Sequence, residues 1–299
     1  MIHDEDAQLS LSAVLRALGV RDQSGSRLLA TNFRKSVWRV ETPDGPCVVR
    51  LLAPSEERAA AHEREVLLVA RSSGVPAPFL RAHATVQGRP ALLLSWSDGR
   101  TLAAESRARP WSVRRLGMLM GEQQARVHRV RASFSDSVAW YDCFGTADAA
   151  MRERLEAVQT PEPRLLHLDY HADNVILSGR SITGILDWEN AVAGDPRADV
   201  ARTWSLMSLR PREPQHAGSF AKAFRPLLTA GWWRGYTRST GPLDDMALFR
   251  AWAACGLLRN MRRRYAGEGG WMIEQGVPAL EASVAKLRAA AGLPPGEFS

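Results

Sequence analysis

The spacing of hydrophobic residues changes several times within the first 96 residues. Apolar positions three and four residues apart predict helices over residues 7–19 and 56–71. Short apolar runs separated by turn residues predict strands that form a hairpin within residues 27–52, and a second strand pair over residues 82–96. This order of elements predicts a small lobe built from a sheet and two helices.

Beyond residue 112 the hydrophobic spacing is mostly helical, and only residues 165–187 interrupt it with short apolar runs around a polar loop. Helical spacing covers residues 112–130, 197–209, 216–235, 243–265 and 277–290. The predicted fold class is therefore α+β. We expect a small mixed β-sheet N-lobe over residues 1–96 and a larger, mainly helical C-lobe over residues 97–299.

The net charge of +7 is unevenly distributed along the chain. Residues 201–299 contain 14 Lys and Arg against 7 Asp and Glu, so this last third carries the whole excess and the first 200 residues are neutral. A basic chain raises nucleic-acid binding as a candidate function. No Lys/Arg-rich tail or zinc-finger spacing is present, and the one dense cluster, at residues 262–264, is typical of a helix end. The sequence therefore argues against a nucleic-acid partner.

The cellular compartment is indicated by the cysteines and by the hydrophobic runs. Cys47, Cys143 and Cys255 are far apart and lack metal-ligand spacing, which is typical of reduced thiols. The sequence contains no run of eighteen apolar residues, the length needed to span a membrane. The first residues carry acids where a signal peptide would carry Lys or Arg. We expect a cytoplasmic protein without a membrane partner.

Oxygen-bearing side chains gather in the stretch where the helical pattern breaks. A predicted strand at residues 165–166 leads into the polar loop His167–Asn174, which contains Asp169. A later predicted strand ends directly on Asp187, and we expect these strands to be adjacent in one hairpin. Carboxylate and amide oxygens suit Mg²⁺, which binds few protein ligands together with phosphates and water. The ordered set H-x-D-x-x-x-x-N, then an apolar strand and Asp, favours a functional site over solvated turns.

Three motifs in this stretch resemble those of the aminoglycoside-phosphotransferase and choline-kinase-like family. Residues 167–174 read HLDYHADN and resemble its catalytic loop, with Leu168 where the family usually has Gly. Residues 186–189 read LDWE and are similar to its metal-binding segment, and residues 194–201 read GDPRADVA, like the motif that follows it. The resemblance implies a bilobal, protein-kinase-like fold. It also implies a kinase that uses ATP or GTP with Mg²⁺, with Asp169 as catalytic base and with Asn174 and Asp187 as metal ligands.

The same resemblance extends more weakly into the N-lobe. Arg50 occupies the position on the third strand where a phosphate-binding cation is expected. On the predicted helix 56–71, Glu63 lies on the apolar face and is preferred over Glu65 as its acidic partner. Ser95 and Trp96 fall at the expected hinge, where backbone groups would bind the purine.

Two further acids of the motif region, Asp195 and Asp199, are expected to brace the catalytic loop, and His167 is expected to be structural. The chain shows no Ser or Cys in a nucleophile context, which leaves hydrolase chemistry without support. Three functions therefore compete: an active kinase for an antibiotic or a metabolite of the choline, homoserine or sugar type, a non-catalytic nucleotide-binding relative, and a nucleic-acid-binding protein. The complete set of Asp169, Asn174 and Asp187 favours the first.

The acceptor is expected to be a small hydroxyl compound that is not a polycation. A site for polycationic aminoglycosides needs acids, whereas the helical region after Asp187 is basic. The acids of that region are Glu213, Asp244, Asp245, Glu268, Glu274, Glu281 and Glu297. Its tryptophans are Trp204, Trp232, Trp233, Trp252 and Trp271, of which most are expected in the core and one or two at a cleft.

Overall fold

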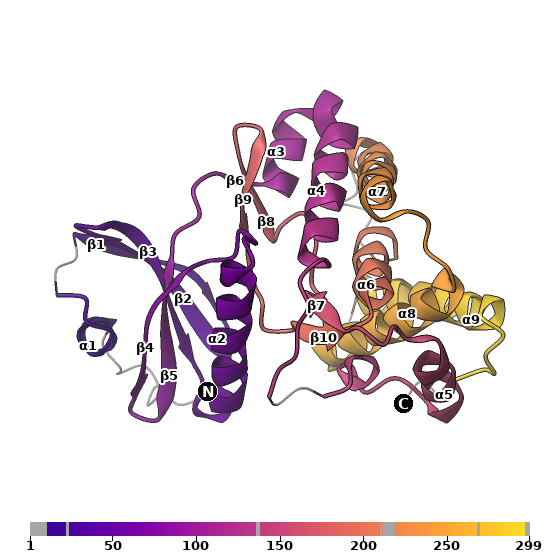
Figure 1. Ribbon diagram of the computed structural model, residues 1–299, viewed down its shortest axis with the longest axis horizontal. Coiled ribbons are helices and arrows are strands. Elements are labelled where there is room, and N and C mark those ends of the chain that lie inside the picture. The colour runs from indigo at the N-terminus through magenta and orange to yellow at the C-terminus, as the bar shows by residue number, and fades with distance from the viewer. Residues whose placement is uncertain are drawn as a thin grey trace. The chain divides into compact units, whose positions relative to one another are not determined.

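The chain is described here by a computed structural model that covers residues 11–21, 24–135, 138–209, 211, 219–267 and 270–296 (Figure 1). It forms two compact units. The first ends at Asp98 and also includes the segment Gly184–Glu189, and the second comprises Gly99–Thr183 and the chain from Asn190 onward. The boundary predicted at residue 96 stays a prediction.

The first unit is a five-stranded antiparallel sheet with one helix on each face. Its strands follow the order β1-β2-β3-β5-β4, with bounds Gly25–Thr31, Lys35–Thr42, Gly45–Leu52, Leu80–Val86 and Arg89–Ser95 for β1 to β5. The helices are α1 (Leu11–Ala17) and α2 (Glu57–Ser72), with the short 3₁₀ turn η2 (Pro54–Glu56) before α2. The hairpin β2–β3 and the strand pair β4–β5 were predicted from sequence, and both are confirmed.

Successive side chains of β3 point to opposite faces of this sheet. Cys47, Val49 and Leu51 point into the core under α1, together with Val14 and Leu15 of that helix. The residues between them face the opposite side. There Arg50 lies against Glu63 of α2, which is buried, so the helix that covers this face also contacts the cation.

Two features of the first unit differ from the prediction. The sequence does not predict β1 as a strand of its own, because all seven of its residues are exposed and show no hydrophobic alternation. Of the helix predicted over residues 7–19, the structure shows α1 (Leu11–Ala17), and residues 7–10 lie outside the described part of the chain.

The second unit is mainly helical, as predicted. Its helices are α3 (Leu102–Ala108), α4 (Val113–Val127), α5 (Ala149–Val158), α6 (Pro196–Ser208), α7 (Ser219–Thr240), α8 (Met246–Arg264) and α9 (Val277–Ala290). Short 3₁₀ turns lie at Pro110–Ser112 and Trp140–Asp142, and a π-helical turn at Met272–Gly276 precedes α9. Helices α3 and α5 had no counterpart among the predicted elements, because each is short and has only a few buried positions.

The strands around the polar loop pair differently from the prediction. Strand β7 (Arg164–Leu166) pairs with β10 (Val192–Gly194). Strands β6 (Arg100–Thr101), β8 (Val175–Ser178) and β9 (Ser181–Ile185) form a separate sheet in that order. The expectation that residues 165–187 form one hairpin is therefore wrong for β7, since apolar runs indicate strands but not their partners.

Helices α4 and α7 pack with their backbones in contact. A Cβ on Gly121 would lie 2.1 Å from the carbonyl oxygen of Trp232, and one on Gly235 would lie 2.1 Å from that of Met118. The glycines that allow this approach are spaced four apart on both helices, at Gly117, Gly121, Gly231 and Gly235. Only residues without a side chain permit this separation. The contact fixes α4, whose side chains Gln124 and His128 contact Asp199 of α6.

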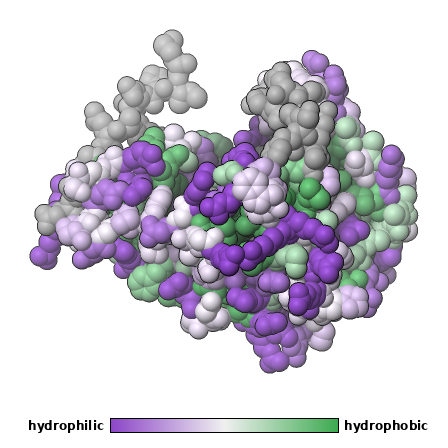
Figure 2. Space-filling model, turned by 90° about the horizontal axis from the view of Figure 1, so that it is seen from above, coloured by the Kyte–Doolittle hydropathy of each residue, from purple (hydrophilic) through white to green (hydrophobic). Residues whose placement is uncertain are grey.

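Hydrophobic side chains of both units are largely internal. On the face seen in Figure 2, hydrophobic residues form small areas interspersed with hydrophilic ones. Within the described residues, no helix is both long enough and apolar enough to cross a membrane.

Candidate active site

The polar loop after β7 is held by a carboxylate from α6. Leu165 and Leu166 are buried in β7. The carboxylate of the fully buried Asp199 accepts hydrogen bonds from the backbone N–H groups of His167, at 3.2 Å, and of Leu168, at 2.7 Å. The expectation that Asp199 braces the loop is confirmed by these contacts. Asp195 instead accepts from the backbone of Arg197 and Thr160, so it caps α6.

Leu168 has the left-handed backbone conformation that glycine adopts without strain. Its φ is 58°, and the side chain is buried. A leucine in this region is strained by about 1–2 kcal/mol. The strain persists because both backbone groups are fixed, the N–H by Asp199 and the carbonyl by Arg202 Nε at 3.2 Å. The loop therefore keeps the turn that a glycine would favour.

Asp199 also joins a buried network that reaches α4 and α7. His128 Nε2 lies 2.9 Å from Asp199 Oδ2, and Gln124 Nε2 donates to the same oxygen at 3.2 Å. His128 Nδ1 in turn lies 2.7 Å from the hydroxyl of Tyr236. Burial alone would raise the pKa of Asp199, but the hydrogen bond and charge of His128, with smaller contributions from His167 and Gln124, hold it below its ordinary value. Asp199 is thus an ionised anchor.

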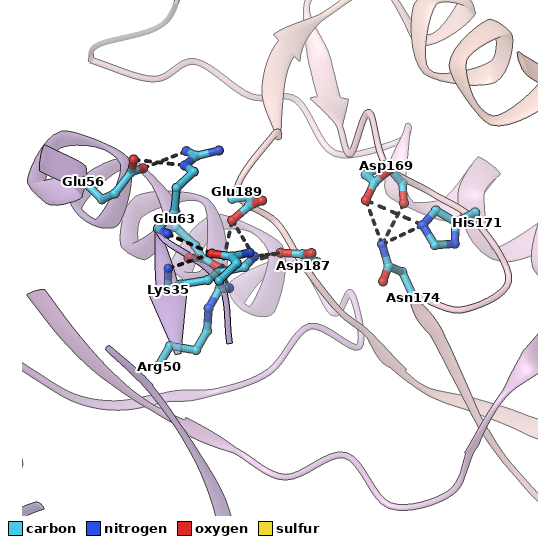
Figure 3. Close-up of polar contacts among 11 residues, drawn as sticks. Lys35, Arg50, Glu56, Glu63, Asp169, His171, Asn174, Asp187 and Glu189 are labelled. Carbon is cyan, nitrogen blue, oxygen red and sulfur yellow. Dashed lines mark hydrogen bonds and ion pairs between the residues drawn. The ribbon is translucent and has the colours of Figure 1, made fainter. Parts of the chain in front are cut away.

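Asp169 lies in the loop beside Asn174 and His171 (Figure 3). Asn174 Nδ2 donates to the backbone oxygen of Asp169 at 3.0 Å and to its Oδ2 at 3.1 Å. His171 Nε2 lies 3.6 Å from the same Oδ2. Burial opposes ionisation of Asp169, but His171 and the charges of Arg202 and His167 hold its pKa below the ordinary value. The carboxylate is ionised at neutral pH, and its side chain remains 24% exposed, so it can meet a substrate hydroxyl.

A second cluster of charges lies in the first unit. Arg50 NH1 pairs with Glu63, the partner preferred from the helix pattern. Arg50 NH2 lies 3.2 Å from Glu189 Oε2 and 3.6 Å from Asp187 Oδ1. Burial would lower the pKa of Arg50, but the carboxylates of Glu63, Asp187 and Glu189 outweigh it, so this pKa is raised. The guanidinium is a permanent charge with a fixed direction.

Two members of this cluster were not predicted from sequence. Lys35 Nζ lies 2.7 Å from Glu189 Oε2 and 3.3 Å from Asp187 Oδ1 (Figure 3). A sequence signal existed for each. Lys35 is one of only three lysines among 39 basic residues, and Glu189 is two positions beyond Asp187 in the LDWE motif.

The residues predicted at the hinge have defined partners. Ser95 ends β5, where its hydroxyl accepts a hydrogen bond from the backbone N–H of Phe79 at 2.8 Å. The ring of Trp96 lies 4.5 Å from the guanidinium carbon of Arg39. Both side chains are partly exposed. Their contacts to a nucleotide stay predictions.

Two of the five tryptophans of the basic helical region are fully buried, and Trp204, Trp233 and Trp271 are partly exposed. Trp232 and Trp252 are fully buried, which confirms the core assignment for these two. Trp204 and Trp233 flank Arg250, whose guanidinium carbon lies 4.8 Å and 5.6 Å from their rings. Among the acids, Asp245 pairs with Arg197 and Glu281 with Arg262. Glu213, Glu268 and Glu297 lie outside the described residues.

Comparisons with known proteins identify a family for this chain. A sequence profile described as the phosphotransferase enzyme family matches residues 27–242, more than half of the chain. Among curated protein sequences, no significant match is found.

Solved structures share the fold at low sequence identity. The aminoglycoside-3'-phosphotransferase of type VIII is 19% identical, with a TM-score of 0.57 over 83% of this chain and 98% of that one. A thermostable mutant of aminoglycoside phosphotransferase APH(4)-Ia, in a ternary complex with AMP-PNP and hygromycin B, is 14% identical, with a TM-score of 0.62 over 95% and 98% of the chains. Spectinomycin phosphotransferase APH(9)-Ia, in complex with ADP and spectinomycin, is 11% identical, with a TM-score of 0.56 over 94% and 97%.

An antiparallel sheet unit followed by a helical unit is the protein-kinase-like fold that these solved phosphotransferases share. The predicted α+β fold class is thereby confirmed. The chain belongs to the phosphotransferase enzyme family.

Proposed function

We propose that this enzyme transfers the γ-phosphoryl group of ATP or GTP to a hydroxyl of a small molecule, with Asp169 as the catalytic base. The observation that supports this most is the ionised, accessible Asp169 held beside Asn174 in a loop anchored by Asp199. Asp169 would orient the acceptor hydroxyl and accept its proton at a carboxylate oxygen. Solved relatives in complex with AMP-PNP or ADP support the nucleotide as the donor.

The other residues of the two clusters are assigned to binding. Arg50, held by Glu63, would bind the α- and β-phosphates, and backbone groups at Ser95 and Trp96 would bind the purine. Phosphoryl transfer requires positioning and charge neutralisation rather than covalent chemistry by the protein. These residues would therefore orient the nucleotide before Asp169 acts.

We propose that Asn174 of the second unit and Asp187 of the first supply oxygen ligands to a magnesium ion, a role that the chemistry of both side chains suits. The Nδ2 group of Asn174 is used by Asp169, which leaves its Oδ1 as a ligand, and the Asp187 carboxylate is 32% exposed. No group of three or more His, Cys, Asp or Glu side chains in the described residues is arranged to hold a metal by itself. Mg²⁺ takes one or two protein oxygens together with phosphates and water. When bound, the ion would neutralise charge on the phosphate oxygens.

Asp187→Asn raises the Mg²⁺ concentration required for nucleotide binding much more than Asp195→Asn does. Both variants remove one carboxylate charge, but Asp195 caps α6 and pairs with Arg197. Titrating Mg²⁺ at fixed nucleotide concentration and following binding by calorimetry measures the difference. Coincident titration curves for the two variants remove Asp187 from the metal site.

The proposed acceptor is a neutral, weakly cationic or anionic hydroxyl compound, such as a macrolide or a small metabolite. The excess positive charge of residues 201–299 supports this, as do the ion pairs that already engage Asp245 and Glu281. Either antibiotic inactivation by O-phosphorylation or a metabolite kinase reaction would follow. The proposed location is the cytoplasm, since the reaction consumes a nucleoside triphosphate and the three cysteines are free thiols.

A screen of nucleotide consumption tests the function and the acceptor together. We expect a macrolide or small hydroxy compound to reach a kcat/KM of about 10⁴ M⁻¹s⁻¹ or more, the lower end of the usual enzyme range. Aminoglycosides, macrolides, peptide antibiotics, choline, homoserine and sugars form the panel. Such a value on a polycationic aminoglycoside alone would overturn the acceptor assignment. Turnover on none of them, together with binding to nucleic acid that falls steeply with salt, would overturn the kinase proposal.

A further inference from the structure

Lys35 forms ion pairs with the two acids of the LDWE motif. Its ammonium group contacts Glu189 Oε2 at 2.7 Å and Asp187 Oδ1 at 3.3 Å, the two oxygens that Arg50 NH2 also approaches. We propose that Lys35 is a second phosphate-binding cation of the nucleotide site, which exchanges these carboxylates for phosphate oxygens when nucleotide binds. The inference rests on the proposed function, because it takes the nucleotide site as given.

The strand register places Lys35 and Arg50 on one face of the sheet. Val37 of β2 is paired with Arg50 of β3, and Lys35 is paired with Leu52. Residues directly opposite each other, and residues two apart on a strand, share a face. The two cations are therefore diagonal neighbours, and both side chains are directed to the same carboxylates (Figure 3). A phosphate chain that meets Arg50 on this face comes within reach of Lys35 as well.

The backbone around Lys35 is fixed without a glycine-rich sequence. Asn32 Oδ1 accepts hydrogen bonds from the N–H groups of Arg34 and Lys35, both at 2.9 Å. Arg34 is joined to Glu56 by two hydrogen bonds, at 3.0 Å and 2.7 Å. The β1–β2 turn is thus held at several points, so an exchange of partners by Lys35 requires rotation of its side chain only.

A magnesium ion would change the balance of charge in this cluster. Three acidic side chains, those of Glu63, Asp187 and Glu189, face the two cations. A magnesium ion bound by Asp187 would repel the ammonium group, while phosphate oxygens offer it a new partner. Lysine suits the change better than arginine, because its compact charge sits on a flexible four-carbon stem. In a chain with only three lysines, one of them occupies this position.

Lys35→Met tests the proposal through two binding constants that change in opposite directions. Calorimetry measures the Kd of ATP and of AMP in the presence of Mg²⁺, and electron paramagnetic resonance measures Mn²⁺ binding without nucleotide. We expect about 10- to 100-fold weaker ATP binding, the range for a lost hydrogen bond to a charged group. The Kd of AMP, which lacks the outer phosphates, changes less than about threefold, because the lost contact is made only to those phosphates. Mn²⁺ binds about two- to fivefold more tightly, because an ion pair that competed for the carboxylates is gone.

Two further variants separate the role of Lys35 from a loss of charge or of structure. Arg27→Met removes one positive charge from exposed β1 of the same sheet and should leave all three constants near wild type. Lys35→Arg keeps the charge and should restore most of the ATP affinity. Equal ATP affinity in wild type and Lys35→Met, or parallel losses for ATP and AMP with unchanged Mn²⁺ binding, overturns the inference while the proposed function stands. Failure of the wild type to bind ATP at all overturns both.

Discussion

Replacing Asp169 with alanine lowers kcat by about 10²–10⁴-fold, the usual contribution of a general base. The nucleotide Kd stays within about threefold of wild type, because a base that acts on the acceptor hydroxyl does not bind the nucleotide. Single-turnover kinetics with a saturating acceptor measure the first quantity and calorimetry the second. Retention of more than about a tenth of kcat would show that another group takes the proton.

Asp173→Ala is the matched control for this experiment. Asp173 belongs to the same loop and contacts His171 at 3.7 Å, as Asp169 does at 3.6 Å, but its side chain is 64% exposed. We expect it to keep kcat within about threefold, because its exposed carboxylate accepts no hydrogen bond from a backbone N–H of the loop among the described residues. A loss as large as that of Asp169→Ala would mean that the loop, rather than one carboxylate, is sensitive to substitution.

Asp199→Asn lowers the free energy of unfolding by about 2–5 kcal/mol, since several buried donors lose a charged acceptor at once. The backbone N–H groups of His167 and Leu168 and the amide of Gln124 all donate to this carboxylate. We also expect kcat to fall, because the loop that carries Asp169, the proposed catalytic base, depends on the same bonds. Urea unfolding at pH 7, with the exposed Asp245→Asn as control, measures the difference.

The pH dependence of Asp199→Asn has a defined sign. The pKa of Asp199 is lower in the folded chain than its ordinary value of about 3.9. The stability that Asp199 contributes is therefore fully present above that ordinary value and is lost as the pH falls through the lowered pKa. The wild type should lose stability on acidification more steeply than the variant. Parallel stability curves for the two proteins would show that Asp199 is not an ionised anchor.

The residues that sequence reasoning identified are those whose signal is local. Asp169, Asn174 and Asp187 stand at fixed spacing within one short stretch, and Glu63 follows from the periodicity of a single helix. The α4–α7 network could not be found in this way. His128 and Tyr236 meet only through the packing of two helices more than a hundred residues apart in sequence.

The role of Lys35 also depends on contacts that local sequence patterns do not reveal. Its partners Asp187 and Glu189 come from a segment that joins the first unit from the middle of the chain, and no local pattern reveals such a return. Strand β1 was missed for a different reason, because its exposed residues leave no hydrophobic alternation to detect. Sequence thus predicts motifs and the elements with one buried face, while tertiary pairing decides the rest.

The glycine contact between α4 and α7 can form only late in the synthesis of the chain. The glycine face of α4 is covered only when α7, which ends at Thr240, has been synthesised. The first unit likewise waits for Gly184–Glu189, although its sheet is complete at Ser95. Both units therefore remain incomplete during most of translation, and segments that expose apolar surface in this state are prone to aggregate. The first unit, whose last segment ends at Glu189, can still be completed while part of the second unit remains to be synthesised.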